Sequence, residues 1–459
     1  MLRTVEIPLW LLVVILLFAA VTFASHFLFP SVRWFFRRRA ERVIARVNTR
    51  LARPIQPFKL ARRHDMIQRL LYDPAVTEAI VDHARKEGVP ENVAFETAKR
   101  YAREIVPSFS ATAYFTFGIR LARWLSRSLY RIRLGTFDRR LLDDIDPDAT
   151  VIFVMNHRSN MDYVLVTWLV SETSPLSYAV GEWARVWPLS GMIRAMGAYF
   201  IRRKSRGNLY RKVLARYVQM ATKGGVTQAI FPEGGLSLTG QTAPPRMGLL
   251  SYIVEDHDPG GRDVIFVPVA LNYDRVLEDR ILIRAGQAGN RRFRPPIFKA
   301  IFGLLRYFVR WILRLTKPYG TASVGFGEPL SLTEFEGDVD ALAEVLMGRI
   351  RSVVPILPVP LVSHLLLEEG PVTEAALTAR VAALIEQFEG TGLTLPRREP
   401  RRVTDDALRI LAERRLIERG EPVSVTPGEE PVLAYYANSI RHHLGEDAAP
   451  AIVDSASAK

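Results

Sequence analysis

The 459-residue sequence contains no cysteine. This absence excludes a disulfide scaffold, a thiolate metal site, a cysteine nucleophile and a relay through an acyl-cysteine. The sequence also lacks the motifs of nucleic-acid modules, such as zinc-ligand spacing, an RNP-like aromatic strand or a helix-turn-helix signature. We therefore expect no nucleic-acid partner.

The sequence has fewer acidic than basic residues. It contains 62 Lys and Arg but only 48 Asp and Glu, which gives a formal net charge of +14. Such an excess favours an anionic partner, here lipid headgroups or phosphorylated substrates. With 48% apolar and 24% charged residues, the chain is typical of a globular protein and not of a disordered one. Its length allows two or three domains of roughly 100–200 residues each.

The longest uncharged stretch runs from Ile7 to Phe29 and holds no Asp, Glu, Lys or Arg. At ~1.5 Å per residue it reaches about 34 Å, enough to cross a hydrocarbon core of ~30 Å. Arginines follow it between residues 33 and 46, whereas the preceding flank has only Arg3 against Glu6. The positive-inside rule therefore predicts a single-pass anchor at residues 1–32 in a bacterial-type inner membrane, with the catalytic body in the cytoplasm. A cleaved signal peptide is the alternative, but its positive charge precedes the apolar run.

Residues 297–318 are predicted to form a basic amphipathic helix, because their cations recur at helical spacing opposite an apolar arc. These cations are Lys299, Arg306, Arg310, Arg314 and Lys317. Such a helix either packs on the core with a solvated arginine face or lies in the headgroup layer of an anionic leaflet. A second segment, residues 118–133, repeats the pattern with Arg120, Arg123, Arg127 and Arg131. Anionic membrane lipids are therefore expected partners.

The hydrophobic patterning changes twice along the rest of the chain. Residues 33–107 have mainly helical spacing, and residues 331–459 become helical again. Between them, residues 108–330 alternate short β-branched runs with longer periodic stretches. Strand and helix in alternation predict an α/β domain with a mostly parallel sheet, flanked by helical N-terminal and C-terminal regions.

His157 has the most informative surroundings among the histidines. The buried-strand pattern of residues 150–155 ends in a loop that contains His157, and a helix pattern follows from Met161. Asp162 then lies in the first helical turn, where the dipole favours a carboxylate and the side chain can point back at the imidazole. A carboxylate on one ring nitrogen fixes the tautomer and leaves the other nitrogen as a general base. A loop histidine with a purely structural hydrogen bond is the alternative.

Two further loops follow predicted strands. In QAIFPEGGLSLTG, Gly234 and Gly235 allow close approach of the backbone and can present N–H groups to an oxyanion, while Glu233 can bind hydroxyls. In GAYFIRRKSRGN, cations crowd a strand end, where open α/β sheets bind ligands and clustered guanidinium groups suit phosphate. They are Arg202, Arg203, Lys204 and Arg206. A structural turn and a plain basic loop are the respective alternatives.

Asp256, His257 and Asp258 look like a metal cluster, but the Pro-Gly-Gly that follows them favours a solvated turn. No metal is therefore expected. Ser237 is a poor nucleophile candidate, because its surroundings do not match GxSxG.

Taken in order, NHRSNMD, GAYFIRRKSRGN, FPEGGLSLTG and VPVALNYDRVLE resemble the glycerolipid acyltransferases that carry an HxxxxD motif, over about Val151 to Glu278. These motifs are most similar to those of membrane-bound glycerol-3-phosphate acyltransferase, whose first motif is HRSxMDY and whose second is GAFFIRR. YAREIVPSFS and VLAYYANSIRHHL also look like that family. The resemblance implies His157 as the base, Asp162 as its partner, Arg202 and Arg203 as ligands of the acceptor phosphate, and Glu233 and Gly234 as an acceptor-binding pair.

The sequence departs from this pattern in the third block. The family's version resembles EGGRSRTG, whereas Leu236 and Leu238 occupy the two arginine positions here. Two lost cations would cost several kcal/mol if both made charge-assisted bonds to phosphate. Either Arg246 replaces part of that charge, or the acceptor is less phosphorylated, differently shaped or already acylated.

The chemistry that the resemblance implies is transfer of a fatty acyl group from a thioester, on coenzyme A or acyl carrier protein, to glycerol 3-phosphate. This is the first step of phospholipid synthesis and needs no cofactor beyond the acyl-CoA or acyl-ACP substrate. Without a cysteine or an elbow serine, direct attack is simpler than an acyl-enzyme. The alternatives are a lysophosphatidate acyltransferase, a lysophospholipid hydrolase and a non-catalytic membrane adaptor.

Overall fold

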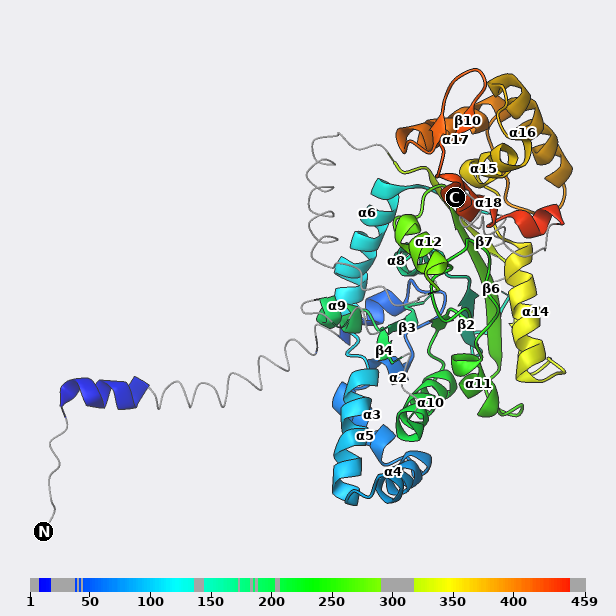
Figure 1. Ribbon diagram of the computed structural model, residues 1–459. Helices are drawn as coiled ribbons and strands as arrows, with labels where there is room; N and C mark the ends of the chain where they lie inside the picture. The colour runs from blue at the N-terminus through cyan, green and yellow to red at the C-terminus, as the bar shows by residue number, and fades with distance from the viewer. Residues whose placement is uncertain are drawn as a thin grey trace, which may run out of the picture. The chain divides into compact units, whose positions relative to one another are not determined.

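The computed structural model describes residues 8–17, 38, 41–42, 44–135, 144–171, 174–181, 185, 189–202, 207–289 and 318–445 (Figure 1). The chain divides into two compact units, Met1–Pro54 and Ile55–Lys459. In the first unit, residues 9–17 are helical. Apart from residues 8–17 and Pro318, the expected anchor span and the expected amphipathic helix at 297–318 lie outside the described residues. Within the described ranges, no helix combines the length and apolarity needed to cross a membrane.

The second unit is built on a mostly parallel sheet, as the alternating pattern predicted. Its described strands are β1 (Arg131–Leu134), β2 (Thr150–Met155), β3 (Ser177–Gly181), β4 (Tyr199–Ile201), β5 (Gln228–Ile230), β6 (Val264–Tyr273), β7 (Thr321–Phe326) and β8 (Leu330–Ser331). They are ordered β1-β7-β6-β2-β5-β3-β4, and β8 pairs with β6. Only the β6–β7 and β6–β8 pairs are antiparallel among these.

The two faces of the sheet belong to two different apolar cores. Val151, Phe153 and Met155 of β2 point into one core, and Ile152 and Val154 point into the other. This follows from the two-residue repeat of a strand. Because both faces are covered, every residue of β2 is buried and the strand reads as one continuous apolar run.

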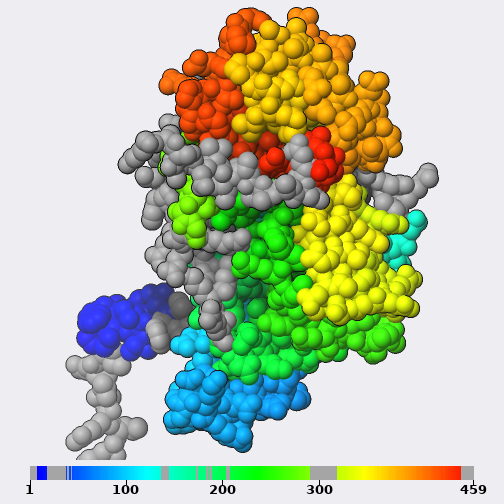
Figure 2. Space-filling model, turned by 45° about the vertical axis from the view of Figure 1, so that its right-hand side comes forward, coloured from blue at the N-terminus to red at the C-terminus, as the bar shows by residue number. Residues whose placement is uncertain are grey.

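Helices cover both faces. One core receives α3 (Arg63–Leu71), α4 (Pro74–Glu87), α5 (Glu91–Ile105), α10 (Asn208–Lys223), α11 (Gly248–Glu255) and α14 (Val339–Ser352). The other receives α6 (Ile119–Leu129), α8 (Met161–Leu169), α12 (Asp279–Gln287), α15 (Pro358–Glu369), α16 (Glu374–Phe388), α17 (Pro400–Glu413) and α18 (Glu430–Ala437). Helices α3–α5 and helices α15–α17 lie at opposite ends of the second unit (Figure 1, Figure 2).

The remaining elements are short. They are α2 (Pro57–Leu60), the π-helix η1 (Ala113–Gly118), α9 (Leu189–Ala195), the 3-10 helix η3 (Arg441–Leu444), and an antiparallel pair of β9 (Ile417–Glu418) and β10 (Ser424–Val425). The sequence predicted only helices for the C-terminal region, so this pair was missed. Strands of two residues carry too short an alternation to be recognised.

Local sequence signals explain where the helices begin and end. At α4, the Asp73 side chain accepts a hydrogen bond from the Ala75 N–H at 3.1 Å, and Pro74 occupies the first helical position. Gly88 ends the helix with a φ of 65°, a left-handed conformation that favours glycine. These signals fix α4 and α5 as separate helices on either side of Gly88.

Candidate active site

The loop after β2 is fixed to the neighbouring strand. The Asn156 amide donates to the Leu271 carbonyl at 3.0 Å, and its Oδ1 accepts from the Leu271 N–H at 2.7 Å. Because β6 lies next to β2, this pair of bonds sets the start of the His157 loop. The loop therefore leaves the carboxyl end of a central strand, where open α/β sheets bind ligands.

His157 and Asp162 are in direct contact. The imidazole Nδ1 lies 2.9 Å from Asp162 Oδ2, and α8 begins at Met161, so the acid sits in the first helical turn. The same carboxylate oxygen accepts from the Arg158 N–H at 2.7 Å and the Ser159 N–H at 3.0 Å. Its other oxygen accepts from the Tyr273 hydroxyl at 2.6 Å. Four donors hold one carboxylate, which orients the imidazole with Nε2 as its free nitrogen.

The pair is buried among aromatic rings. The side chains of His157 and Asp162 are 3% and 0% exposed. The imidazole centroid lies 4.1 Å from the Phe231 ring and 5.4 Å from the Tyr163 ring. In such surroundings a charged partner acts on the imidazole with little screening by water.

An apolar cavity of about 220 Å³ lies beside the pair. Asn160 and Tyr163 form part of its wall, and the Tyr163 ring is also a neighbour of the imidazole. The other lining residues come from η1, α6, α8, β3, α9 and the residue after α9, and are Phe117, Gly118, Leu121, Ala122, Leu125, Val164, Thr167, Tyr178, Val180, Leu189, Met192, Ile193 and Met196.

Glu233 holds the His157 loop. Its Oε1 accepts from the His157 N–H at 2.8 Å, and its Oε2 accepts from the Ala243 N–H at 2.9 Å. The residue is 1% exposed, and burial raises its pKa to about 7. The sequence suggested that this carboxylate binds acceptor hydroxyls. In the structure each oxygen accepts from a backbone donor, so Glu233 positions the loop, and its binding of acceptor hydroxyls stays a prediction.

This raised pKa predicts a pH-dependent stability. The folded chain binds the Glu233 proton more tightly than the unfolded chain, so stability present below pH 4.5 is lost as the pH rises through about 7. The loss amounts to about 3 kcal/mol at most. Glu233→Gln stays neutral at every pH, so we expect the unfolding free energies of wild type and variant to diverge between pH 4.5 and 8, as the wild type loses stability that the variant keeps. Chemical denaturation across that range measures this, and a gap that stays constant would contradict it.

Gly234 is required by the turn that follows. Its φ is +66°, its N–H donates to the Phe231 carbonyl at 3.0 Å, and a Cβ would lie 2.7 Å from Arg246 Cδ. The N–H is therefore engaged in the turn and not free for an oxyanion. Arg246 is exposed and crosses over Gly234. Leu236 and Leu238 pack against the core beneath the C-terminal helices, which explains apolar residues at these positions.

Arg202 follows β4 and pairs with a residue that sequence reasoning missed. Its Nε and Nη2 donate to the Glu104 carboxylate at 2.9 and 2.7 Å. Three strand spacings, about 14 Å, separate β4 from β2, so Arg202 and His157 lie along the same edge of the sheet without touching. Arg203 and Lys204 lie outside the described residues.

Sequence reasoning also missed two residues of the segment VPVALNYDRVLE that contact the His157 loop or Asp162, namely Tyr273 and Glu278. Tyr273 bonds Asp162, and Glu278 accepts from the Ser159 hydroxyl at 2.9 Å and the Asn160 amide at 3.0 Å. Burial raises the pKa of Glu278. Tyr273 ends β6 and Glu278 follows it, and β6 runs parallel to β2. Their place at the carboxyl end of a strand in the same sheet was the signal that could have found them.

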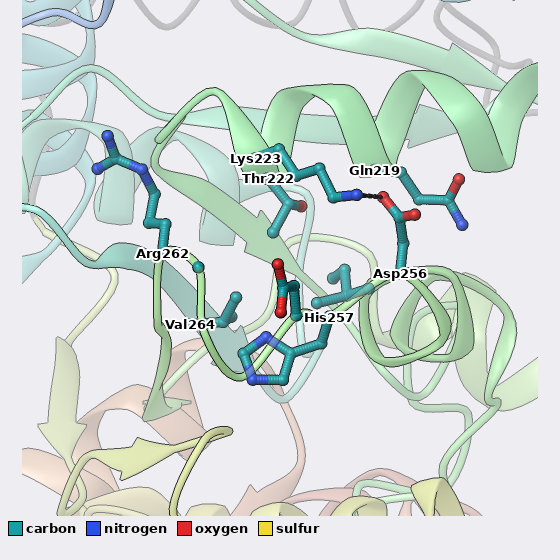
Figure 3. Close-up of a pocket in the computed structure, with 10 residues that line it drawn as sticks. Gln219, Thr222, Lys223, Asp256, His257, Arg262 and Val264 are labelled. Atoms are coloured by element: carbon teal, nitrogen blue, oxygen red, sulfur yellow. Dashed lines mark ion pairs between the residues drawn. The ribbon is translucent and has the colours of Figure 1, made fainter.

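A second cavity, of about 260 Å³, lies at the amino end of β6 and thus away from His157 (Figure 3). Lys223 and Asp256 form an ion pair across it at 3.0 Å, and His257 Nε2 lies 3.2 Å from the Thr333 hydroxyl. Among the described side chains, no group of three His, Asp or Glu is arranged to hold a metal ion.

Comparison with known proteins gives two family matches. The Acyltransferase family model matches residues 138–272, and that of the glycerol-3-phosphate acyltransferase C-terminal region matches residues 301–457. The chain is 27% identical to a glycerol-3-phosphate acyltransferase of Aeromonas hydrophila subsp. hydrophila, over 84% of this chain and 50% of the relative. It is 28% identical to one of Xanthomonas campestris pv. campestris, over 88% of this chain and 48% of the relative. The chain thus spans about half the length of these curated relatives.

Solved structures match as well, one of them an acyltransferase. It is the 1-acyl-sn-glycerophosphate (LPA) acyltransferase PlsC from Thermotoga maritima, with a TM-score of 0.33 and 20% identity over 52% of this chain and 76% of that chain. A likeness of this size adds nothing to the two family matches.

Proposed function

Because the chain belongs to the glycerol-3-phosphate acyltransferase family of the acyltransferase superfamily, we propose that it transfers a fatty acyl group from a thioester to the 1-hydroxyl of glycerol 3-phosphate. The observation that supports this most is the His157–Asp162 pair at the carboxyl edge of the sheet, beside an apolar cavity. The thioester is acyl-CoA or acyl-ACP, and no other cofactor takes part in the proposed reaction.

His157 Nε2 removes the proton from the acceptor hydroxyl while the hydroxyl oxygen attacks the thioester carbonyl carbon. The tetrahedral intermediate then collapses, the C–S bond breaks, and the thiol leaves with the proton from Nε2. An ester and a free thiol result. Asp162 stabilises the imidazolium that exists between these steps, and its four donors keep it in place without a rearrangement.

The apolar cavity suits the acyl chain of the donor. Apart from Asn160 and Thr167, its walls are formed by apolar and aromatic side chains and a glycine, so a hydrocarbon chain loses its contact with water there at no cost to polar partners. Tyr163 belongs to both the cavity wall and the imidazole surroundings. We propose that this arrangement brings the thioester carbonyl next to His157. The cavity also weighs against an adaptor that binds lipid surfaces only.

A thiol-release assay over a panel of acceptors tests the proposed function. The full chain receives an acyl-CoA together with glycerol 3-phosphate, 1-acylglycerol 3-phosphate, or no acceptor. Thiol release that depends on glycerol 3-phosphate is the expected result. Dependence on 1-acylglycerol 3-phosphate instead would identify a lysophosphatidate acyltransferase, and release of fatty acid without an acceptor would identify a hydrolase.

We further propose that residues 7–29 anchor the chain in a bacterial-type inner membrane with residues 33–459 in the cytoplasm, because the uncharged run is long enough and arginines follow it. The full chain is expected to stay in the membrane pellet after an alkaline carbonate wash, and a chain without residues 1–32 is expected in the supernatant. Release of the full chain by carbonate would exclude a spanning anchor.

A further inference from the structure

One buried carboxylate joins two arginines from different segments. Glu104, near the end of α5, has a side chain that is 3% exposed and accepts both Nε and Nη2 of Arg202. The Arg185 Nη1 donates to the same carboxylate at 2.5 Å. The two arginine side chains remain 31% and 35% exposed. Glu104 thus binds two guanidinium groups whose side chains remain partly exposed.

This carboxylate does not balance the cations around it. Two arginines and one glutamate leave a charge of +1, and further arginines lie close by. Burial and the charge of Arg185 lower the pKa of Arg194, and burial together with Arg194 and Arg103 lowers the pKa of Arg63. Cations that a fold keeps together repel one another, so an anionic ligand is favoured at this place.

Arg202 is fixed by aromatic contacts as well. Its guanidinium carbon lies 5.1 Å from the ring centroid of Tyr101 and 5.8 Å from that of Tyr210. The Tyr210 hydroxyl accepts a hydrogen bond from the Arg202 backbone N–H at 2.8 Å. A guanidinium held in this way loses little freedom when it binds a ligand, which is a condition for tight phosphate recognition.

We propose that Arg185 and Arg202 form a clamp for a phosphate monoester and that Glu104 is the residue that positions them. The inference rests on the proposed function, in which the acceptor and coenzyme A both carry such a group. It adds Arg185 as a second cation beside Arg202. This chain has Leu236 and Leu238 at two positions where the family's third motif resembles one with arginines. The phosphate of the acceptor and that of coenzyme A share this chemistry, and the experiment separates them.

The experiment uses the full chain and measures equilibrium binding of glycerol 3-phosphate and of coenzyme A in separate titrations. Arg185→Gln is expected to weaken one of the two at least about tenfold, because a charge-assisted bond to phosphate is lost. Weakened glycerol 3-phosphate binding assigns the clamp to the acceptor, and weakened coenzyme A binding assigns it to the donor. Arg185→Lys keeps the charge without the planar fork and is expected to lie between wild type and Arg185→Gln.

Arg216→Gln is the matched control. Arg216 on α10 donates to Asp73 through Nε and Nη2 at 2.9 and 2.7 Å and is 26% exposed, so it loses an equivalent pair outside the proposed clamp. The Arg216→Gln variant is expected to bind both ligands as tightly as the wild type does. Equal losses in Arg216→Gln and Arg185→Gln, or none in Arg185→Gln, would overturn the clamp.

Glu104→Gln tests positioning. We expect the KM for the clamped substrate to rise about tenfold while kcat and the KM for the other substrate stay within about twofold. If Glu104→Gln instead lowers kcat and weakens the binding of both ligands, the variant has lost its fold in general, and Glu104 has a structural role only. Binding that depends on Arg185 in a chain that does not acylate glycerol 3-phosphate would refute the proposed function and leave the clamp standing. Acylation with unchanged binding in Arg185→Gln would refute the clamp alone.

Discussion

His157→Ala is expected to lower kcat for acyl transfer by roughly 10²- to 10⁴-fold, the contribution that a positioned general base makes. The imidazole is the group whose free nitrogen is left available by the Asp162 contact, and the proposed reaction has no other base. Thiol release by the purified variant at saturating substrate measures the effect. The KM values are expected to change little, because the imidazole is needed for proton transfer and not for affinity.

His257→Ala is the matched control for this experiment. His257 lines the cavity at the amino end of β6, so its loss leaves the proposed base untouched. Its kcat is expected to stay near the wild-type value. Near-normal turnover in folded His157→Ala would remove the base assignment, whatever the control shows.

Asp162→Asn is expected to lower kcat by a comparable factor while the fold persists. An asparagine oxygen can still accept from His157, Arg158 and Ser159, and its amide can donate to the Tyr273 oxygen once that hydroxyl turns. The geometry is therefore kept and the negative charge is lost. Without that charge the imidazolium is no longer stabilised, and the wrong tautomer becomes accessible.

Asp162→Ala separates the charge from the hydrogen bonds. It leaves the buried Arg158 and Ser159 N–H groups without an acceptor, at about 1–3 kcal/mol each. We expect a clearly lower thermal unfolding midpoint for Asp162→Ala and a small shift for Asp162→Asn, measured on the full chains. Full activity in Asp162→Asn would show that the carboxylate serves the fold and not the reaction.

The sequence was sufficient wherever the signal was local. The five apolar residues of β2 that follow Thr150 are continuous because the strand is covered on both faces, and the loop and first helical turn that follow already bring Asp162 back to His157. The mostly parallel sheet followed from the alternation of strand and helix. The antiparallel direction of β7 against β6 did not, because a strand has the same two-residue repeat in either direction.

Side-chain contacts between residues far apart in the chain could not be predicted from the sequence. Glu104 lies in a helix of the N-terminal region and Arg202 follows β4, so nothing in either segment indicates that the two meet. Glu233 was predicted to face substrate hydroxyls, because a carboxylate beside two glycines after a strand suits binding as well as it suits a turn. Only the fold shows that the backbone N–H groups of His157 and Ala243 occupy it.

Helix α18 completes the surroundings of the His157 loop from far downstream in the chain. The Tyr436 hydroxyl accepts from the Val276 N–H at 3.0 Å, and the Asn438 amide donates to the Thr239 carbonyl at 2.8 Å. The Arg158 guanidinium lies 4.8 Å from the Tyr435 ring centroid. A polypeptide still growing on the ribosome lacks these partners until residues beyond Glu430 have emerged, so the surroundings of the His157 loop are completed only late in synthesis.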